Sequence, residues 1–485
     1  MKKTIILSAL SGLLTSAAFS FDRLFFLVFF SYIPLFIALN GCSKKQLKYA
    51  ALIFSVCLYC PLLSFIYPLK GMLPVDGAAA VFAIFAVTVM VSCFQALLAW
   101  LPLRLLNNKK GRYALYVCPF LLIVGDWLQC INPIFAFPYA SAAVCAGNIT
   151  AFIQSASLFG SFFVSYLILL FNSFIAFVIM KKTSVNDYAA VSVLLFLNTL
   201  YGCIRLSTYR QDGEIKAVIV QGNQSCKKKW DVSTDETIRI YSALLNGAVN
   251  ESGVAVFPET TVTEPINEQL IDRLSELSKE SGCNIVMGAQ YIVDGNRYNA
   301  VICIDENGLR GKPYFKRKLV LFGERIPFYD YLPYRIRGSY INFTEGSEAI
   351  PIDTGMGITG GIICYESMYP QLAREAAVNG ADFLTVVSND SWFEDTNAVN
   401  IHFRHSILRS VETGKGVLRC ANTGISASIS PVGTLTDTLP PMERTAKECS
   451  IALSSGRTLY DIVGDIFIYI FLMVITVKKI ISKNT

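Results

Sequence analysis

Charged residues are scarce in this chain of 485 residues: Asp, Glu, Lys and Arg make up only 16% of it, whereas hydrophobic residues make up 53%. The mean hydropathy of +0.46 exceeds that of ordinary soluble domains. Long linkers, repeats and low-complexity tracts are absent. The net charge of +6 comes mostly from short basic clusters between apolar runs, so it does not indicate a nucleic-acid partner. The composition favours a membrane part joined to a soluble part.

Histidine is almost missing, since the chain has only His402 and His405. Histidine is the most frequent general base and a common metal ligand. The i, i+3 spacing of the pair suits a metal ion, but no acidic ligand lies near them in the sequence. The cysteines of residues 205–455 form no CxxC or Cys/His zinc spacing. We therefore expect no metal and no cofactor, and a catalytic base of another type.

The apolar residues are concentrated in one part of the chain. Residues 1–204 are mainly hydrophobic runs, whereas residues 205–455 have the charges, turns and alternating strands of a soluble domain. A membrane span needs about 20 apolar residues, and most runs reach this length. We predict a transmembrane helical domain of about seven spans over 1–204, a soluble domain over 205–455, and a C-terminal span with a cytoplasmic tail over 456–485. The eight runs are 4–21, 24–40, 49–69, 78–101, 113–128, 155–180, 188–204 and 462–477.

Lysine and arginine alternate between the two sides of this eight-span topology. By the positive-inside rule, both termini face the cytoplasm, and the domain that follows the seventh span lies outside. The charge pattern and the span count therefore agree. The basic residues are Lys2 and Lys3 before the first run, Lys44, Lys45 and Lys48 after the second, Lys109, Lys110 and Arg112 after the fourth, Lys181 and Lys182 after the sixth, and Lys478, Lys479 and Lys483 after the eighth.

Two features of the apolar runs have an alternative interpretation. The first twenty residues have the basic start and the small residues of a cleaved signal peptide. Cleavage there would remove one span and spoil the alternation of charge, so we favour a span. Asp465 lies within the short eighth run. Acidic residues in spans are often functional, but at a span end the carboxylate can instead reach lipid headgroups.

The soluble region alternates strand-like and helical segments. Its strand-like runs are rich in Val and Ile and are bounded by Gly, Asn, Asp and Pro. Helical segments alternate with some of them, which indicates a layered α/β domain long enough to bury its own core. The expected strands are 215–223, 253–259, 284–292, 299–305, 357–364, 382–390, 415–422 and 424–433, and the expected helices are 266–281, 367–379 and 398–414.

Reactive side chains follow several of these strands. Glu259 ends "AVFPE", Cys364 ends "GIIC", and Lys316 and Glu324 lie between them in "YFKRKLVLFGERIPF". Functional groups often sit in loops at strand ends. A thiol is a weak nucleophile until it loses its proton, which a carboxylate can accept, while a lysine cation can stabilise thiolate and oxyanion. Separately, each residue also fits an ordinary role: a core cysteine, a turn glutamate or a solvated lysine.

In combination these segments resemble the nitrilase superfamily, whose active site is a Glu–Lys–Cys triad. "FPET", "YFKRKLVLFGERIPF", "GIICYES" and "SNDSWF" occur in that order. The membrane spans before and after them, with "VQGN", "GDWLQ" and "FAFPYASA", extend the resemblance over almost the whole chain to the apolipoprotein N-acyltransferase family. The resemblance implies a polytopic helical membrane domain plus an extracytoplasmic nitrilase-like αββα sandwich.

The resemblance also implies residue roles. Glu259 is expected as general base, Lys316 as stabiliser of the oxyanion and intermediate, and Cys364 as nucleophile. The backbone N–H of Tyr365 could be a further oxyanion donor. Other positions that match the family's supporting or substrate-binding residues are Glu324, Trp230, Tyr365 and Glu366.

Three positions leave details open. Trp230 could pack on an acyl chain or substrate, or be an ordinary core aromatic. The family usually has a histidine and a proline where this chain has Lys318 and Leu321. The spacing from Lys316 to Glu324 is intact, so we expect these departures to affect the loop more than the triad.

The reaction implied by the resemblance is a two-step acyl transfer at the bacterial inner membrane, on its periplasmic side. A phospholipid, which the resemblance suggests to be phosphatidylethanolamine, donates the acyl chain to Cys364. The α-amine of a diacylglyceryl-modified N-terminal cysteine on an apolipoprotein then accepts it. Two alternatives remain open at this stage. One is a membrane-anchored carbon–nitrogen hydrolase, and the other is a non-catalytic nitrilase-like binding module.

Overall fold

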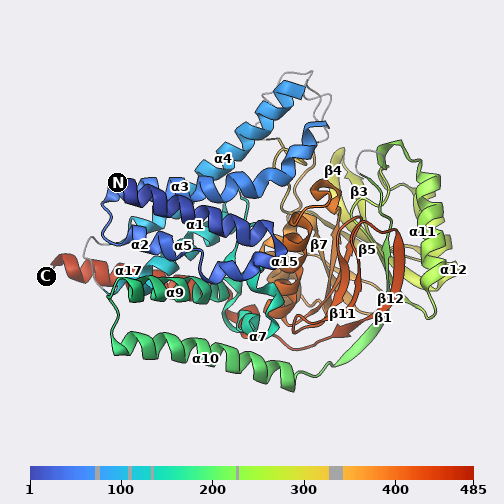
Figure 1. Ribbon diagram of the computed structural model, residues 1–485. Coiled ribbons are helices and arrows are strands. Elements are labelled where there is room, and N and C mark those ends of the chain that lie inside the picture. Colours follow the sequence, from blue (N-terminus) through green and yellow to red (C-terminus); the bar gives the residue numbers. More distant parts are fainter. Residues whose placement is uncertain (72–76, 107–111, 133–135, 226–228, 327–341, 485) are drawn as a thin grey trace. The chain divides into compact units, whose positions relative to one another are not determined.

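The protein is described by a computed structural model that covers all residues except 72–76, 107–111, 133–135, 226–228, 327–341 and 485 (Figure 1). It divides into two compact units. The first unit is Met1–Thr208 together with Thr458–Thr485, and the second is Tyr209–Arg457. The C-terminal segment therefore belongs to the same unit as the N-terminal helices.

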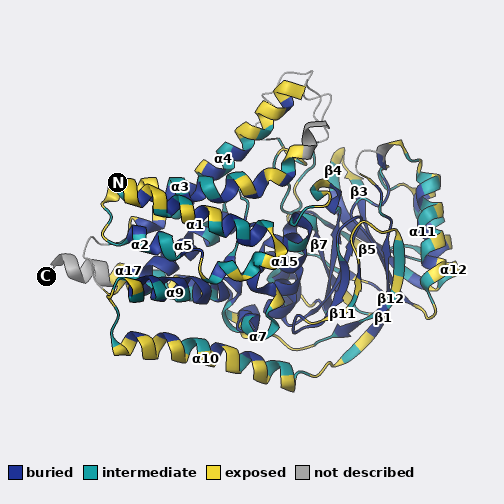
Figure 2. Cartoon of the chain, viewed as in Figure 1, coloured by how far each residue is buried: buried dark blue, intermediate teal, exposed yellow. Residues whose placement is uncertain are grey.

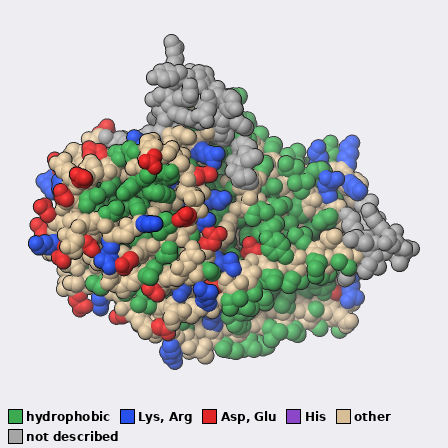
Figure 3. Space-filling model, turned by 180° about the vertical axis from the view of Figure 1, so that it is seen from behind, with side chains coloured by type: hydrophobic (Ala, Val, Ile, Leu, Met, Phe, Trp, Pro, Cys, Tyr) green, Lys and Arg blue, Asp and Glu red, His purple; other side chains and the backbone are tan. Residues whose placement is uncertain are grey.

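The first unit contains helices that are long and apolar enough to cross a membrane. Within the described residues there are seven, and they agree with the first seven predicted runs. Much of their surface is exposed, including Phe196 and Leu197, and Figure 3 shows broad hydrophobic areas on the molecule. Such a surface suits lipid rather than water. The spans are Lys2–Ser20 (α1), Asp22–Leu39 (η1 and α2), Lys44–Tyr67 (α3 and part of η2), Gly77–Leu103 (α4), Ala114–Ile131 (α5), Ser161–Ile179 (α9) and Val185–Thr208 (α10).

The sixth span is shorter than the predicted run 155–180. A short helix, α8 (Ala156–Phe159), ends at Gly160, whose φ of +77° is a conformation that glycine adopts without strain. A Cβ at this position would lie 2.6 Å from the Tyr460 ring. The chain therefore breaks at Gly160, and α9 starts afresh at Ser161.

The eighth run forms part of α17 (Ile466–Asn484), of which Ile466–Val477 is the described apolar stretch. Asp465 lies just before it and accepts hydrogen bonds from Trp127 Nε1 at 3.1 Å and from the Tyr460 hydroxyl at 3.2 Å. Both partners belong to the first unit. The carboxylate thus ties the C-terminal helix to α5, which gives this acid a structural role.

The second unit consists of two six-stranded sheets. The order of the first is β12-β1-β2-β3-β4-β5, and that of the second is β11-β10-β9-β8-β7-β6. Strands β1–β3 and β7–β9 are parallel, whereas the outer strands pair antiparallel. The strands are Gly213–Gln221 (β1), Gly253–Phe257 (β2), Cys283–Val293 (β3), Asn296–Asp305 (β4), Gly308–Phe315 (β5), Pro351–Asp353 (β6), Ile358–Ile363 (β7), Phe383–Ser388 (β8), Gly416–Ala421 (β9), Ser426–Ile429 (β10), Leu435–Leu439 (β11) and Thr445–Leu453 (β12).

Alternation along the strands builds two apolar layers. In β1, Ala217 and Ile219 join the core that both sheets share, while Val218 and Val220 join the core beneath the helices on the other face. Successive strand residues point to opposite faces, so an uninterrupted apolar run fills both layers. Figure 2 shows the central strands mostly in dark blue, the colour of buried residues, and strands β2 and β8 are buried throughout. The helices that cover the first sheet are α11 (Thr234–Ala248) and α12 (Glu268–Ser281), and those on the second are α14 (Pro370–Val378) and α15 (Ala398–Thr413).

This architecture is the predicted αββα sandwich. The central strands β1–β4 and β7–β10 occur where apolar runs predicted them. Four peripheral strands, β5, β6, β11 and β12, and helix α11 were not predicted. Strand β12 includes the charged residues Lys447 and Glu448. It forms a strand because it pairs with β1 over its full length. Peripheral strands lack a continuous apolar run because they face solvent on one side.

Candidate active site

Cys364 directly follows β7 and opens a short 3-10 turn, Cys364–Met368. Its backbone has φ +50°, a left-handed conformation that residues other than glycine rarely adopt. The thiol is half-buried. Backbone strain of this kind persists only where the surroundings enforce it, and it is concentrated at functional sites. The strand end therefore presents Cys364 on a fixed, sharply turned elbow.

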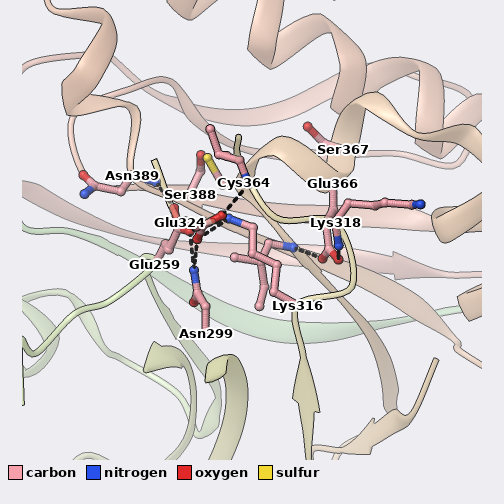
Figure 4. Close-up of polar contacts among 12 residues, drawn as sticks. Glu259, Asn299, Lys316, Lys318, Glu324, Cys364, Glu366, Ser367, Ser388 and Asn389 are labelled. Atoms are coloured by element: carbon pink, nitrogen blue, oxygen red, sulfur yellow. Dashed lines mark hydrogen bonds and ion pairs between the residues drawn. The ribbon is translucent and has the colours of Figure 1, made fainter. Parts of the chain in front are cut away.

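Glu259 follows β2 and is buried. Its Oε1 accepts from Lys316 Nζ at 3.0 Å and from Asn299 Nδ2 at 2.8 Å, and its Oε2 accepts from the backbone N–H of Asn389 at 2.9 Å. A further hydrogen bond links the carboxylate to the Cys364 thiol. Figure 4 shows the Glu259, Lys316 and Asn299 side chains pointing toward one another, whereas Asn389 contributes its backbone. Every contact of this carboxylate thus comes from a different segment of the second unit.

Lys316 follows β5, and its side chain is only 1% exposed. Besides Glu259, it pairs with Glu324 Oε1 at 2.9 Å. Asn299 Nδ2 donates to that same oxygen at 2.8 Å, and Glu324 Oε2 accepts from the Val320 N–H at 2.9 Å. One buried ammonium therefore lies between two carboxylates, and Asn299 bridges them. The local loop supplies Glu324, so a single segment contributes both the cation and its second partner.

The protonation states follow from burial and charge. Burial raises the pKa of Glu259, but the Lys316 charge and the hydrogen bonds outweigh it and hold the pKa below its usual value. Burial lowers the pKa of Lys316, but Glu259 and Glu324 together raise it above its usual value. Burial and the Glu259 charge raise the pKa of Cys364 more than Lys316 lowers it. At rest the site therefore holds a carboxylate, an ammonium and a neutral thiol, which makes Glu259 the available base.

Glu366 is fully buried and clamps the cysteine turn to the lysine loop. It accepts from the backbone N–H of Ile363 at 2.9 Å, of Arg317 at 2.6 Å and of Lys318 at 3.1 Å. The Tyr314 hydroxyl donates to it at 2.9 Å. Burial raises the pKa of this carboxyl, and these bonds oppose the rise. Glu366 thus fixes the spacing between two parts of the site.

The remaining predicted positions lie around this centre. The Tyr365 ring is buried and packs edge-on against Tyr369 at 5.3 Å. Lys318 Nζ lies 5.8 Å above the Tyr369 ring, and its backbone N–H is what Glu366 binds. A lysine in place of histidine therefore leaves that bond intact. Trp230 lies in the turn Lys229–Asp231, and its side chain is outside the described residues.

Sequence reasoning missed Asn299, Ser388 and Asn389. Asn299 lies on β4 next to a buried apolar run, and Ser388 ends β8 beside the Cys364 thiol. The segment "SNDSWF" carried the resemblance but suggested no role for its first residues. A polar residue interrupting a buried apolar strand was the available signal, because burial requires a partner.

A metal ion does not fit the one candidate ligand group found among the described residues. Ligand atoms of Cys364, Asp390 and His402 lie within 4.8 Å of one another. However, both oxygens of Asp390 are engaged, one with His402 Nδ1 at 2.8 Å and the other with Arg419 Nη2 at 2.7 Å. A buried guanidinium already supplies the positive charge there.

Comparison with known proteins identifies both halves of the chain. The carbon-nitrogen hydrolase family model matches residues 216–457, and the model of the apolipoprotein N-acyltransferase N-terminal domain matches residues 11–174. Apolipoprotein N-acyltransferases of Geobacter metallireducens and Borreliella burgdorferi are 25% and 27% identical to it, over 96% and 98% of this chain and 92% and 95% of those proteins. That of Thermotoga maritima is 26% identical over 99% of this chain and 94% of that protein.

Solved structures match the second half of the chain. Saccharomyces cerevisiae Nit3, a nitrilase superfamily member, is 17% identical with a TM-score of 0.39, and the match covers 50% of this chain and 91% of that one. A carbon-nitrogen hydrolase from Helicobacter pylori is 18% identical with a TM-score of 0.38, over 49% of this chain and 89% of that one.

Proposed function

The chain belongs to the apolipoprotein N-acyltransferase family, and from this premise we propose that Glu259, Lys316 and Cys364 carry its reaction. The enzyme transfers a fatty acyl chain from a phospholipid, through an acyl-cysteine thioester, to the α-amine of the N-terminal diacylglyceryl-cysteine of a lipoprotein. The observation that carries the assignment is the meeting of the three groups. A strained, half-buried thiol is hydrogen-bonded to an ionised carboxylate that a buried lysine also contacts.

In the first step, Cys364 Sγ attacks the ester carbonyl of the phospholipid while Glu259 takes the thiol proton. The raised pKa of Cys364 makes proton removal and attack coincide, because a free thiolate is not present at rest. The Lys316 ammonium and the Tyr365 N–H stabilise the tetrahedral oxyanion. The carbon–oxygen ester bond then breaks, Glu259 returns the proton to the leaving oxygen, and a lysophospholipid departs.

In the second step, the lipoprotein α-amine attacks the acyl-Cys364 thioester. Glu259 takes a proton from the amine, the carbon–sulfur bond breaks, and Glu259 gives the proton to Sγ, which restores the thiol of Cys364. The product is an amide, so the lipoprotein gains its third acyl chain. This is covalent catalysis of the ping-pong type, since the donor product leaves before the acceptor reacts.

Three finer points belong to the same proposal. We propose phosphatidylethanolamine as the donor, because the family resemblance suggests it. The multi-pass chain is proposed to lie in the bacterial inner membrane with both termini cytoplasmic and the second unit on the periplasmic side. The alternation of basic residues supports this orientation. Both substrates are then membrane-held, which suits a catalytic domain attached to many spans.

The two alternatives are less well supported. A carbon–nitrogen hydrolase would use the same three groups, but that family model accounts only for residues 216–457. The N-terminal match over 11–174 belongs to the acyltransferases. A non-catalytic module would have no need for a buried ion-pair network around a strained cysteine.

Intact mass spectrometry tests the proposal. The purified protein is incubated with phospholipid and no acceptor, beside Cys364→Ala and a matched control, Cys420→Ala, which removes a buried core thiol. We expect a fatty-acyl mass adduct on the wild type and on Cys420→Ala, absent from Cys364→Ala and discharged by a diacylglyceryl peptide. An adduct that persists on Cys364→Ala would show that the nucleophile is wrong. Intact phospholipid and no adduct on any variant would reject the acyl-enzyme route.

A further inference from the structure

A buried polar network lies behind Cys364, and the reaction described above does not use it. His402, Asp390 and Arg419 are all buried. His402 Nδ1 lies 2.8 Å from Asp390 Oδ1, and Arg419 Nη2 lies 2.7 Å from Asp390 Oδ2. Burial raises the pKa of Asp390, but the Arg419 charge and the hydrogen bonds with His402 and Ser388 hold it below its usual value. Buried charge is costly unless it is paired, so this network needs an explanation.

The network is anchored from several elements. Arg419 on β9 donates to Ser406 Oγ on α15 at 3.1 Å and to the Ile425 carbonyl at 3.1 Å. Gly424 leaves room for the Asp390 carboxylate, because a Cβ there would lie 2.0 Å from Asp390 Oδ2. The fold therefore fixes Asp390 in place, and Asp390 in turn fixes the ring of His402.

The other side of the imidazole faces the cysteine turn. His402 Nε2 lies 3.0 Å from the Cys364 carbonyl oxygen and 3.2 Å from Ser367 Oγ. A carbonyl can only accept, so Nε2 carries a hydrogen and donates it. Arg409 Nη1 donates to the Ser367 carbonyl at 3.1 Å. The turn that holds the nucleophile in its left-handed conformation is thus bound from α15.

The segment Ser388–Asp390, which carries the aspartate of this network, also contacts the reacting groups. Ser388 Oγ donates to Asp390 Oδ1 at 2.6 Å and lies beside the Cys364 thiol, whose pKa it influences. The N–H of Asn389 donates to Glu259. Three consecutive residues therefore connect the buried network to the nucleophile and to the base (Figure 4 shows the first two).

We propose that His402 is a positioning residue for the nucleophile. By holding the Cys364 carbonyl, with Asp390 and Arg419 behind it, His402 keeps the strained turn in the orientation that directs Sγ to Glu259 and to the donor ester. This inference rests on the proposed function, since it takes Cys364 as the acylated residue. His402 therefore has a role in the reaction although Glu259, and not this histidine, acts as the base.

Single-turnover acylation of Cys364 tests the inference with two variants. His402→Leu removes both ring nitrogens, whereas His402→Gln keeps a donor N–H that can reach the Cys364 carbonyl. We expect His402→Leu to slow acyl-adduct formation at saturating phospholipid about 100-fold, the cost of displacing a reacting group by about 1 Å, with KM for the phospholipid unchanged. His402→Gln should recover at least part of this loss. Rates are normalised to folded protein by thermal unfolding, and Ile407→Val on the same helix serves as the packing control.

The outcomes separate the two proposals. A folded His402→Leu that acylates at the wild-type rate, or a folded His402→Gln as slow as His402→Leu, would overturn the positioning role and leave the acyl-enzyme route standing. No adduct on the wild type would overturn the proposed function itself. If His402→Leu does not fold, Asp390→Asn replaces it. Slower acylation at unchanged KM supports the inference, and a wild-type rate contradicts it.

Discussion

At the scale of single residues, the site depends on Lys316 being the shared partner of two carboxylates. Its ammonium lies 3.0 Å from Glu259 and 2.9 Å from Glu324. Removing a buried carboxylate from water costs several kcal/mol, so Glu259 stays ionised only because this cation and the amides around it compensate. A histidine base would become protonated when the pH falls slightly below neutral, whereas the Glu259 carboxylate stays ionised at much lower pH.

The lowered pKa of Glu259 predicts that the acylation rate does not fall when the pH is lowered moderately below neutral. A base acts only above its own pKa, and the pKa of Glu259 is below its usual value. We expect the rate of acyl-Cys364 formation to stay constant from pH 8 down to about pH 5, and to fall only below the ordinary glutamate pKa of about 4.3. Stopped-time mass spectrometry on folded protein measures this rate. A descending limb centred at pH 6–7 would identify a different base.

Because Lys316 is paired with two carboxylates, a second substitution should restore stability to a Lys316 variant without restoring its activity. Lys316→Met leaves two buried carboxylates without their cation, which should lower the free energy of unfolding by about 3 kcal/mol and abolish acylation. Adding Glu259→Gln removes one of these charges, so the double variant should regain part of the stability and none of the activity. Denaturant unfolding and adduct formation measure the two effects. If the double variant instead loses the sum of the stabilities lost by the two single variants, Lys316 and Glu259 are not energetically coupled.

At the scale of elements, the site is built by the ends of parallel strands. Strand β2 delivers Glu259, β7 delivers Cys364 and β8 delivers Ser388, each at its carboxyl end. Close backbone approach is required there, because a Cβ at Gly288 on β3 would lie 2.5 Å from the Glu259 Cα. Glu366 then joins the cysteine turn to the loop that carries Lys316.

Glu366→Gln tests this connection between elements. The amide would keep one acceptor but turn a donor toward backbone N–H groups, so at least one buried N–H loses its partner, at a cost of about 1–3 kcal/mol. We expect a lower melting temperature and acylation at least tenfold slower. The control is Glu375→Gln, which removes the half-exposed partner of Arg317. Equal effects of the two substitutions would contradict the special role of Glu366.

At the scale of the whole molecule, the catalytic unit is inserted between membrane segments. The chain leaves the first unit after Thr208 and returns to it at Thr458, where Asp465 bonds to Trp127. In the proposed topology, the seven spans found among the described residues before the second unit put that unit on the side opposite to the N-terminus. The C-terminal helix then decides on which side the chain ends.

Reporter fusions test the proposed orientation. Alkaline phosphatase fused after residue 212 should be active, because this enzyme needs the oxidising outer compartment, and phosphatase fused at the C-terminus should be inactive. A fluorescent protein at the C-terminus should give the converse result. Activity of the C-terminal phosphatase fusion would remove α17 from the count of spans, and inactivity of the first fusion would invert the orientation.

Features that depend on neighbouring residues could be predicted before the fold was known. Span positions follow from the length of apolar runs, and the central strands follow from runs that must fill two apolar layers. The order of Glu259, Lys316 and Cys364 along the chain was also available, as was the loop spacing to Glu324. Gly160 was the exception within the spans, because its break depends on Tyr460, which lies far away in the chain.

Contacts between side chains from distant segments could not be predicted in this way, because they depend on how the chain folds. The parallel pairing of β7 with β8 and the packing of two sheets bring Asn299 and His402 to the site, beside Glu366, which the resemblance had already indicated. The acidic partner of His402 is Asp390, which the turn after β8 supplies to helix α15. The physical reason is that hydrogen bonding and charge compensation act between atoms a few ångströms apart, and folding alone sets those distances.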